Sequence, residues 1–166
     1  VRVLDVHGKG HVDAITSFRF DDADLDWLAG AGIVDAPTRR RLATFRFTGR
    51  VDAMAEGEVY MPGTPLFTIT GTFAEAVVLE TIVLSVLNHD AAVAAAAARM
   101  VSAAQGRPII DMGTRRTHER AAVAAARAAH VAGFVATSNL AAGREHGIPT
   151  AGTAAHAFTL LHVDEE

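Results

Sequence analysis

The sequence predicts an α/β protein, and three observations carry that prediction. From Pro108 onward, short apolar runs alternate with helical stretches in the order β-α-β-α-β, with short links between them. This order favours a parallel sheet, either open or closed into a barrel. Half of the 166 residues are hydrophobic, which is enough to bury a sizeable core. The composition changes near residue 106, so we expect one domain at 1–106 and the start of a second at 107–166.

Composition and charge exclude several classes of function. The formal net charge of −4 and the pI of about 6.0 argue against a nucleic-acid footprint over the whole surface. The chain has no cysteine, which excludes disulfides and thiolate metal sites and fits a cytoplasmic protein. The most apolar segment, Ala76–Leu87, is interrupted by Glu80 and is too short to span a bilayer. Because the chain begins at Val1 rather than Met, we expect it to be part of a longer protein.

The first seventy residues are predicted to form short elements. Asp21 or Asp22 can cap a helix that runs through Leu28, and Pro37 suits the first turn of a second helix that runs to about Phe45. Alternating apolar residues and turn glycines then predict strands. The predicted strands are Val1–Val6, Phe47–Met54, Glu58–Met61 and Pro65–Ile69.

The longest helical stretch is Phe73–Gln105. Its apolar residues cover most of the helix circumference, so we expect this helix to be buried. Asn88, His89 and Asp90 interrupt the apolar pattern, and Asp90 is predicted to cap a second helix. The alanines that follow leave room for a neighbouring backbone to approach closely. His89 remains open between a site residue and a capping or interface residue.

The remaining elements follow from their end signals. Thr117 is predicted to cap a helix that ends near Ala132, and Asn139 with Ser138 opens a shorter helix that ends near Gly147. The predicted strands between and around them are Pro108–Met112, Phe134–Thr137 and Pro149–Gly152.

Polar side chains follow each of these three strands. The first strand is followed by Arg115 and Arg116, the second by Ser138 and Asn139, and the third by Thr153 and His156. The carboxyl ends of parallel strands meet at one edge of a sheet, so these groups are predicted to lie together. Paired guanidiniums favour an anionic substrate, or else salt bridges that tie a loop.

A histidine with small neighbours can be a base or a nucleophile, although a structural role for His156 stays open. A pair of carboxylates, Glu56 and Glu58, flanks a turn glycine. It indicates either a metal or acid–base site or the solvated tip of a hairpin.

The ordered series of motifs resembles the nicotinate phosphoribosyltransferases, of the type II phosphoribosyltransferase fold. The matching pieces are Gly113-Thr114-Arg115-Arg116, Gly133-Phe134, Thr137-Ser138-Asn139, Gly147-Ile148-Pro149, Gly152-Thr153-Ala154-Ala155-His156, Phe45-Arg46-Phe47-Thr48-Gly49, Glu56-Gly57-Glu58-Val59 and Leu79-Glu80-Thr81. The resemblance implies an amino-terminal α/β sandwich domain followed by an irregular α/β barrel, assembled as a homodimer with shared active sites.

The implied reaction joins nicotinate to phosphoribosyl pyrophosphate and gives nicotinate mononucleotide and pyrophosphate, coupled to ATP hydrolysis with Mg²⁺. The resemblance implies that His156 is phosphorylated, that Thr153 lies against nicotinate, and that Arg115 and Arg116 face anionic groups of the substrates. Ser138 and Asn139 match the family's turn and are further candidates for binding substrate. The later barrel strands and phosphate-binding loops are absent, so we expect this chain alone not to complete the reaction.

Two alternatives stay open. One is a sister enzyme that uses quinolinate or nicotinamide, although the second carboxylate of quinolinate would need more basic residues than this stretch offers. The other is a truncated, non-catalytic homologue that acts as a dimer partner.

Overall fold

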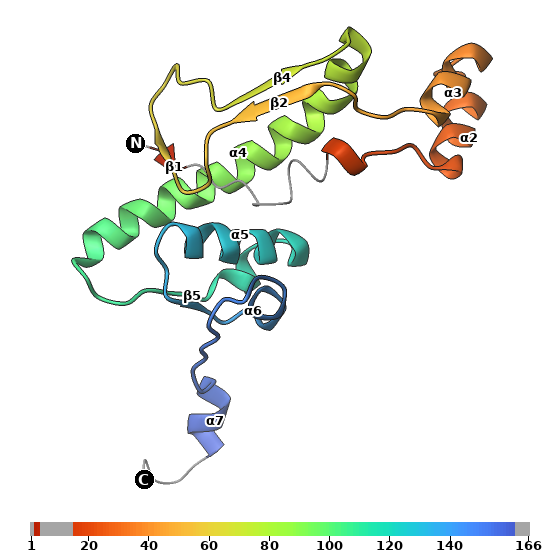
Figure 1. The fold of residues 1–166 in the computed structure, drawn as a ribbon. Coiled ribbons are helices and arrows are strands. Elements are labelled where there is room, and N and C mark those ends of the chain that lie inside the picture. Colours follow the sequence, from red (N-terminus) through yellow and green to blue (C-terminus); the bar gives the residue numbers. More distant parts are fainter. Residues whose placement is uncertain (1, 4–14, 162–166) are drawn as a thin grey trace.

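A computed structural model describes residues 2–3 and 15–161 and confirms a mixed α/β structure (Figure 1). The long helix α4 (Phe73–Ala104) runs through the middle of the molecule. The antiparallel strands β2 (Arg50–Ala53) and β4 (Phe67–Thr70) lie along one side of it, and helix α5 (Glu119–Val131) packs on the other.

The two amino-terminal helices form where the sequence predicts them. Strand β1 (Arg2–Val3) pairs antiparallel with β3 (Val59–Tyr60), and the rest of the predicted strand Val1–Val6 lies outside the described residues. Helix α2 (Asp22–Gly30) begins as predicted, because the Asp21 carboxylate accepts a hydrogen bond from the Asp24 amide across 2.7 Å. Helix α3 spans Ala36–Ala43 and has Pro37 in its first turn.

The start of helix α4 is held by the carboxylate of Glu75, a residue that the sequence analysis did not single out. Glu75 is 6% exposed, and its two oxygens accept hydrogen bonds from the backbone amides and hydroxyls of Thr72 and Thr48, at 2.7–2.9 Å. The donors of Thr72, followed by those of Thr48, lower the pKa of Glu75 from 4.5 to about 2. This capping box fixes the start of α4 against the chain that leads into β2.

The prediction that Asp90 caps a second helix is wrong. Helix α4 continues without a break from Phe73 to Ala104, and Asp90 lies inside it, 3% exposed. The Nδ1 atom of His89 lies 2.9 Å from Oδ1 of Asp90. Helix geometry persists here because the alanines on the carboxyl side favour helix as strongly as the apolar residues before them. A polar residue in such a run therefore does not have to mark a helix boundary.

The two halves of α4 pack in different ways. Leu79 and Val83 in the first half pack against bulky side chains of the β2–β4 ribbon and its approach. In the second half, Ala94 packs against Ala128 of α5, and both are fully buried. The close approach of two helices that the alanine run predicts is therefore present. It brings α5, and the strands that flank α5, against the middle of the molecule.

Complete burial of α4, by contrast, is not observed. Val77 is 51% exposed and Leu84 is 57% exposed, because the described elements cover only two sides of the helix. By length and composition alone, α4 is also the one helix in the described part of the chain that would be able to cross a membrane. In the structure it packs against both a β-ribbon and α5.

The carboxyl-terminal elements form the predicted β/α series. Strands β5 (Ile110–Asp111) and β6 (Ala136–Thr137) are parallel, and the third predicted strand is reduced to a parallel bridge between Thr137 and Thr150. Helix α6 (Leu140–His146) begins at Asn139 and ends at Gly147 in a left-handed conformation, as predicted. The last described element is helix α7 (His156–Leu161), which projects away from α5 and α6 (Figure 1).

One cap in this region differs from the prediction. Helix α5 begins at Glu119 after His118, and Thr117 does not cap it. Thr117 is instead the extended residue that closes the 3₁₀ turn η1 (Gly113–Arg116), and this turn takes up the start that the sequence assigned to α5. The domain boundary near residue 106 stays a prediction.

Candidate active site

The carboxyl end of strand β5, which we call the first strand tip, leads into a short turn that carries two arginines. Strand β5 ends at Asp111, and η1, the arginine turn, begins at Gly113. The Gly113 amide donates to Oδ1 of Asp111 across 2.9 Å, which ties the turn to the end of the strand. Arg115 and Arg116 are exposed, and neither side chain makes a hydrogen bond or ion pair with another residue of the described ranges. Their guanidiniums are therefore available to an anion.

The second strand tip is joined to the first. Thr137 is fully buried, and its hydroxyl donates to Oδ2 of Asp111 across 2.7 Å. The Ser138 amide donates to the backbone oxygen of Asp111 across 2.8 Å. Asp111 thus accepts hydrogen bonds with both its carboxylate oxygens and its carbonyl oxygen, and it links the two tips.

Asn139 adds a further hydrogen bond between the two tips, and both polar atoms of its side chain have partners. Its amide nitrogen Nδ2 donates to Oγ1 of Thr114 across 3.3 Å, while its Oδ1 accepts from the Ala142 amide at the start of α6. Its backbone amide donates to the Thr137 hydroxyl across 3.0 Å. Asn139 is 7% exposed, so both polar atoms of its side chain serve the fold. The half-buried Ser138 keeps its hydroxyl without a partner in the described ranges.

The third strand tip lies at the same edge but is held differently. The Thr137 amide donates to the carbonyl of Pro149, and the Ala151 amide donates to the carbonyl of Thr137. Beyond these bonds Thr153 and His156 are exposed, and no hydrogen bond within the described ranges joins them to the arginine turn. His156 is the first residue of α7. The structure therefore connects the first two tips directly and the third only through backbone bonds.

Sequence reasoning missed Asp111, and it treated Thr114 and Thr137 only as parts of motifs. The signal for Asp111 was present, since it is the one charged residue at the end of an apolar run that begins at Pro108. A carboxylate in that position has to find donors, and the turn amide and the threonine hydroxyl supply them. The partner across the sheet was not readable from the sequence.

Of the two carboxylates Glu56 and Glu58, the structure places Glu56 in an ion pair with a residue of helix α5. Glu56 pairs with Arg127 of α5, and their side chains are 27% and 12% exposed. This ion pair ties the turn after β2 to the helix that packs on α4. No group of three or more histidine and carboxylate side chains within residues 15–161 is arranged to hold a metal ion.

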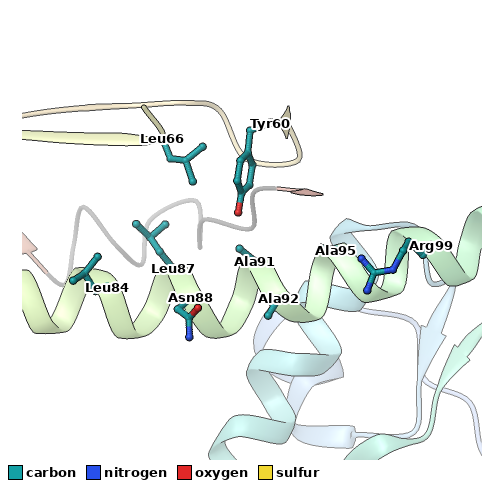
Figure 2. A pocket seen from close by; sticks show the side chains of 9 residues that line it. All are labelled: Tyr60, Leu66, Leu84, Leu87, Asn88, Ala91, Ala92, Ala95 and Arg99. Atoms are coloured by element: carbon teal, nitrogen blue, oxygen red, sulfur yellow. The ribbon is translucent and has the colours of Figure 1, made fainter. Parts of the chain in front are cut away.

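A separate hollow lies between α4 and the loop region around β3. Figure 2 shows it under Tyr60 and Leu66, with Leu87 and Ala91 of α4 as its floor and Arg99 towards one end. Its volume is about 610 Å³. None of the candidate residues at the strand tips lines it, so this hollow is distinct from the candidate active site.

Comparison with known proteins agrees with the motifs. Residues 8–88 match the family described as the nicotinate phosphoribosyltransferase (NAPRTase) N-terminal domain. The chain is 60% identical, over 158 residues, to nicotinate phosphoribosyltransferase pncB1 of Mycobacterium tuberculosis, covering 95% of this chain and 35% of that protein. It is 35% identical, over 155 residues, to the nicotinate phosphoribosyltransferase of Bacillus subtilis, covering 93% of this chain and 32% of that protein.

Solved structures share the fold. The crystal structure of human nicotinic acid phosphoribosyltransferase superimposes with a TM-score of 0.85 at 30% identity, over 96% of this chain and 33% of that one. Nicotinate-nucleotide pyrophosphorylase from Pyrococcus furiosus shares the fold at a TM-score of 0.67 and 24% identity, over 92% of this chain and 46% of that one. The chain spans about a third of the length of the curated relatives it matches. By these motifs, this fold and these relatives, the chain is similar over almost its whole length to part of the nicotinate phosphoribosyltransferases.

Proposed function

We propose that this chain forms part of the active site of a nicotinate phosphoribosyltransferase. The enzyme joins nicotinate to phosphoribosyl pyrophosphate, gives nicotinate mononucleotide and pyrophosphate, and serves NAD salvage. The observation that carries the proposal is the pair of exposed guanidiniums, Arg115 and Arg116, which have no partner among the described residues and stand at the end of a parallel strand. The names of the relatives support the same activity.

The chemistry assigns a role to each tip. A guanidinium of Arg115 or Arg116 holds the carboxylate of nicotinate, and this leaves the ring nitrogen directed at the anomeric carbon of the ribose. The nitrogen–carbon bond forms as the bond from that carbon to pyrophosphate breaks. The second guanidinium stabilises charge on the departing pyrophosphate. Thr153 and the Ser138 hydroxyl are the polar groups that line the nicotinate in this proposal.

His156 is the proposed site of phosphorylation by ATP. The exposed imidazole attacks the terminal phosphorus, the bond from that phosphorus to ADP breaks, and the imidazole proton passes to solvent. The added phosphate brings nearly two negative charges to the edge that carries the arginines. It would change the affinities for substrate and product unequally, and this is how ATP hydrolysis would drive synthesis.

Mg²⁺ belongs to the proposed reaction as an ion that neutralises pyrophosphate charge. The described residues offer no cluster of metal ligands that fits it. A homodimer with shared active sites and a cytoplasmic location complete the proposal.

Turnover by the complete polypeptide tests the proposal. Purified protein is incubated with labelled phosphoribosyl pyrophosphate and with nicotinate, nicotinamide or quinolinate in parallel. We expect nicotinate mononucleotide and pyrophosphate from nicotinate and a far lower rate from the other two. A preference for nicotinamide or quinolinate would assign the sister activity, and no product with any substrate would favour a non-catalytic partner.

A further inference from the structure

The hydroxyl of Thr137 makes hydrogen bonds with both residues whose side chains hold the arginine turn, Asp111 and Asn139. It donates to Asp111, whose other carboxylate oxygen accepts from the Gly113 amide. It also accepts from the backbone amide of Asn139, whose side chain donates to Thr114. We propose that Asp111 and Thr137 are positioning residues that set the location of the Arg115 and Arg116 guanidiniums and thereby the affinity for the anionic substrate. This inference rests on the proposed function of the same site.

The turn itself needs such support. It is a 3₁₀ segment of four residues, Gly113–Arg116, and its N-cap Met112 makes no side-chain capping bond. Short 3₁₀ segments have poor hydrogen-bond geometry and gain little stability from their own backbone. Two side chains from the strand edge hold the turn instead: Asp111 at Gly113 and Asn139 at Thr114. Both depend on the same buried hydroxyl.

The arrangement also explains why a carboxylate so close in sequence does not neutralise the arginines. Each oxygen of the Asp111 carboxylate already accepts a hydrogen bond, one from Gly113 and one from Thr137. The guanidiniums of Arg115 and Arg116 make no ion pair in the described ranges. The Asp111 carboxylate is engaged by Gly113 and Thr137, and the two guanidiniums remain available to substrate.

The test removes the hydroxyl and keeps the shape. Thr137→Val lacks the donor and acceptor, and Thr137→Ser retains both. In the complete polypeptide we expect Thr137→Val to raise the KM for nicotinate about tenfold with kcat within about twofold, since one lost hydrogen bond in a polar network has that order of effect. Thr137→Ser should restore the KM. A merely structural role would lower kcat through loss of active protein and leave KM unchanged.

Thr114 provides the second variant, because it is exposed and its substitution does not disturb the core. Thr114→Val removes the acceptor for Asn139, and Thr114→Ser keeps it. We expect Thr114→Val to raise the nicotinate KM about threefold, the effect of losing one partly buried hydrogen bond. If Thr137→Val does not fold, the KM of Thr114→Val is measured in its place.

Hydrogen exchange separates failure of this inference from failure of the proposed function. The Gly113 amide should exchange faster in Thr137→Val than in wild type or Thr137→Ser, whether or not the protein turns over nicotinate. An inactive wild type with this exchange pattern would overturn the proposed function and keep the positioning role. An active wild type whose KM and Gly113 exchange are unchanged in Thr137→Val would overturn the positioning role.

Discussion

The first two strand tips and the third stand at one edge of the same parallel sheet, but they are held in different ways. Asp111, Thr137 and Asn139 join the tips of β5 and β6 through side-chain hydrogen bonds at 2.7–3.3 Å. Thr153 and His156 follow the bridge at Thr150 and have no such bonds within the described ranges. The difference separates a fixed set of cations, suited to recognition, from an accessible imidazole, suited to group transfer.

The sharpest way to separate the two regions is to remove the imidazole. His156→Ala should abolish phosphorylation by ATP, because no other group at the third tip is a comparable nucleophile. Mass spectrometry of the intact protein after incubation with ATP gives the result. His118→Ala is the matched control, since His118 is also exposed and lies before α5. Phosphate retained in His156→Ala would contradict the assignment of His156 as the phosphorylated residue.

The second prediction concerns the support beneath the first two tips. Ala128 is fully buried where α5 meets α4, so Ala128→Leu overfills that contact. We expect a loss of about 1–3 kcal/mol in the free energy of unfolding, measured by chemical denaturation. Ala103→Leu, at an exposed position near the end of α4, should change stability little. Equal effects of the two substitutions would mean that the alanine contact does not carry α5.

The third prediction concerns Glu75, which is not part of the strand tips, so its substitution should leave nicotinate binding unchanged. Glu75 has a folded-state pKa of about 2, below the ordinary value of 4.5, so its ionised form stabilises the fold. Its contribution is fully present above pH 4.5 and is lost as the pH falls through about 2. Glu75→Gln should therefore lower the thermal midpoint at neutral pH, with the difference from wild type closing between pH 4.5 and 2.

Glu80→Gln is the control for Glu75→Gln, because Glu80 is exposed on the same helix. A deficit in Glu75→Gln that stays constant from neutral to acid pH would contradict the capping role of the carboxylate.

How much of this the sequence predicted depends on whether a signal is local. The cap Asn139 and the stop Gly147 of α6 were readable, because capping uses neighbouring residues. Asp90 carried the same local signal and misled, because the residues on both sides of it favour helix and α4 runs straight through. Asp111 and Thr137 meet across a sheet, 26 positions apart, and one sequence does not reveal that pairing.

Strand ends were predicted less well than helix ends, because they depend on residues distant in the sequence. The predicted strands Phe47–Met54 and Pro65–Ile69 shrank to Arg50–Ala53 and Phe67–Thr70, since pairing in the sheet sets strand ends. The site residues Arg115, Arg116, Ser138, Thr153 and His156 were named from their places after strands, and their roles with substrate stay predictions.

Binding of nicotinate to the complete polypeptide, measured by calorimetry, tests most directly whether the paired cations at the first tip recognise the substrate. We expect Arg115→Gln combined with Arg116→Gln to weaken nicotinate binding at least about tenfold, the effect of losing a charge-assisted bidentate contact. Arg120→Gln, an exposed arginine on the adjoining helix, should bind as wild type does. Unchanged affinity in the double variant, with wild type binding nicotinate normally, would contradict the account.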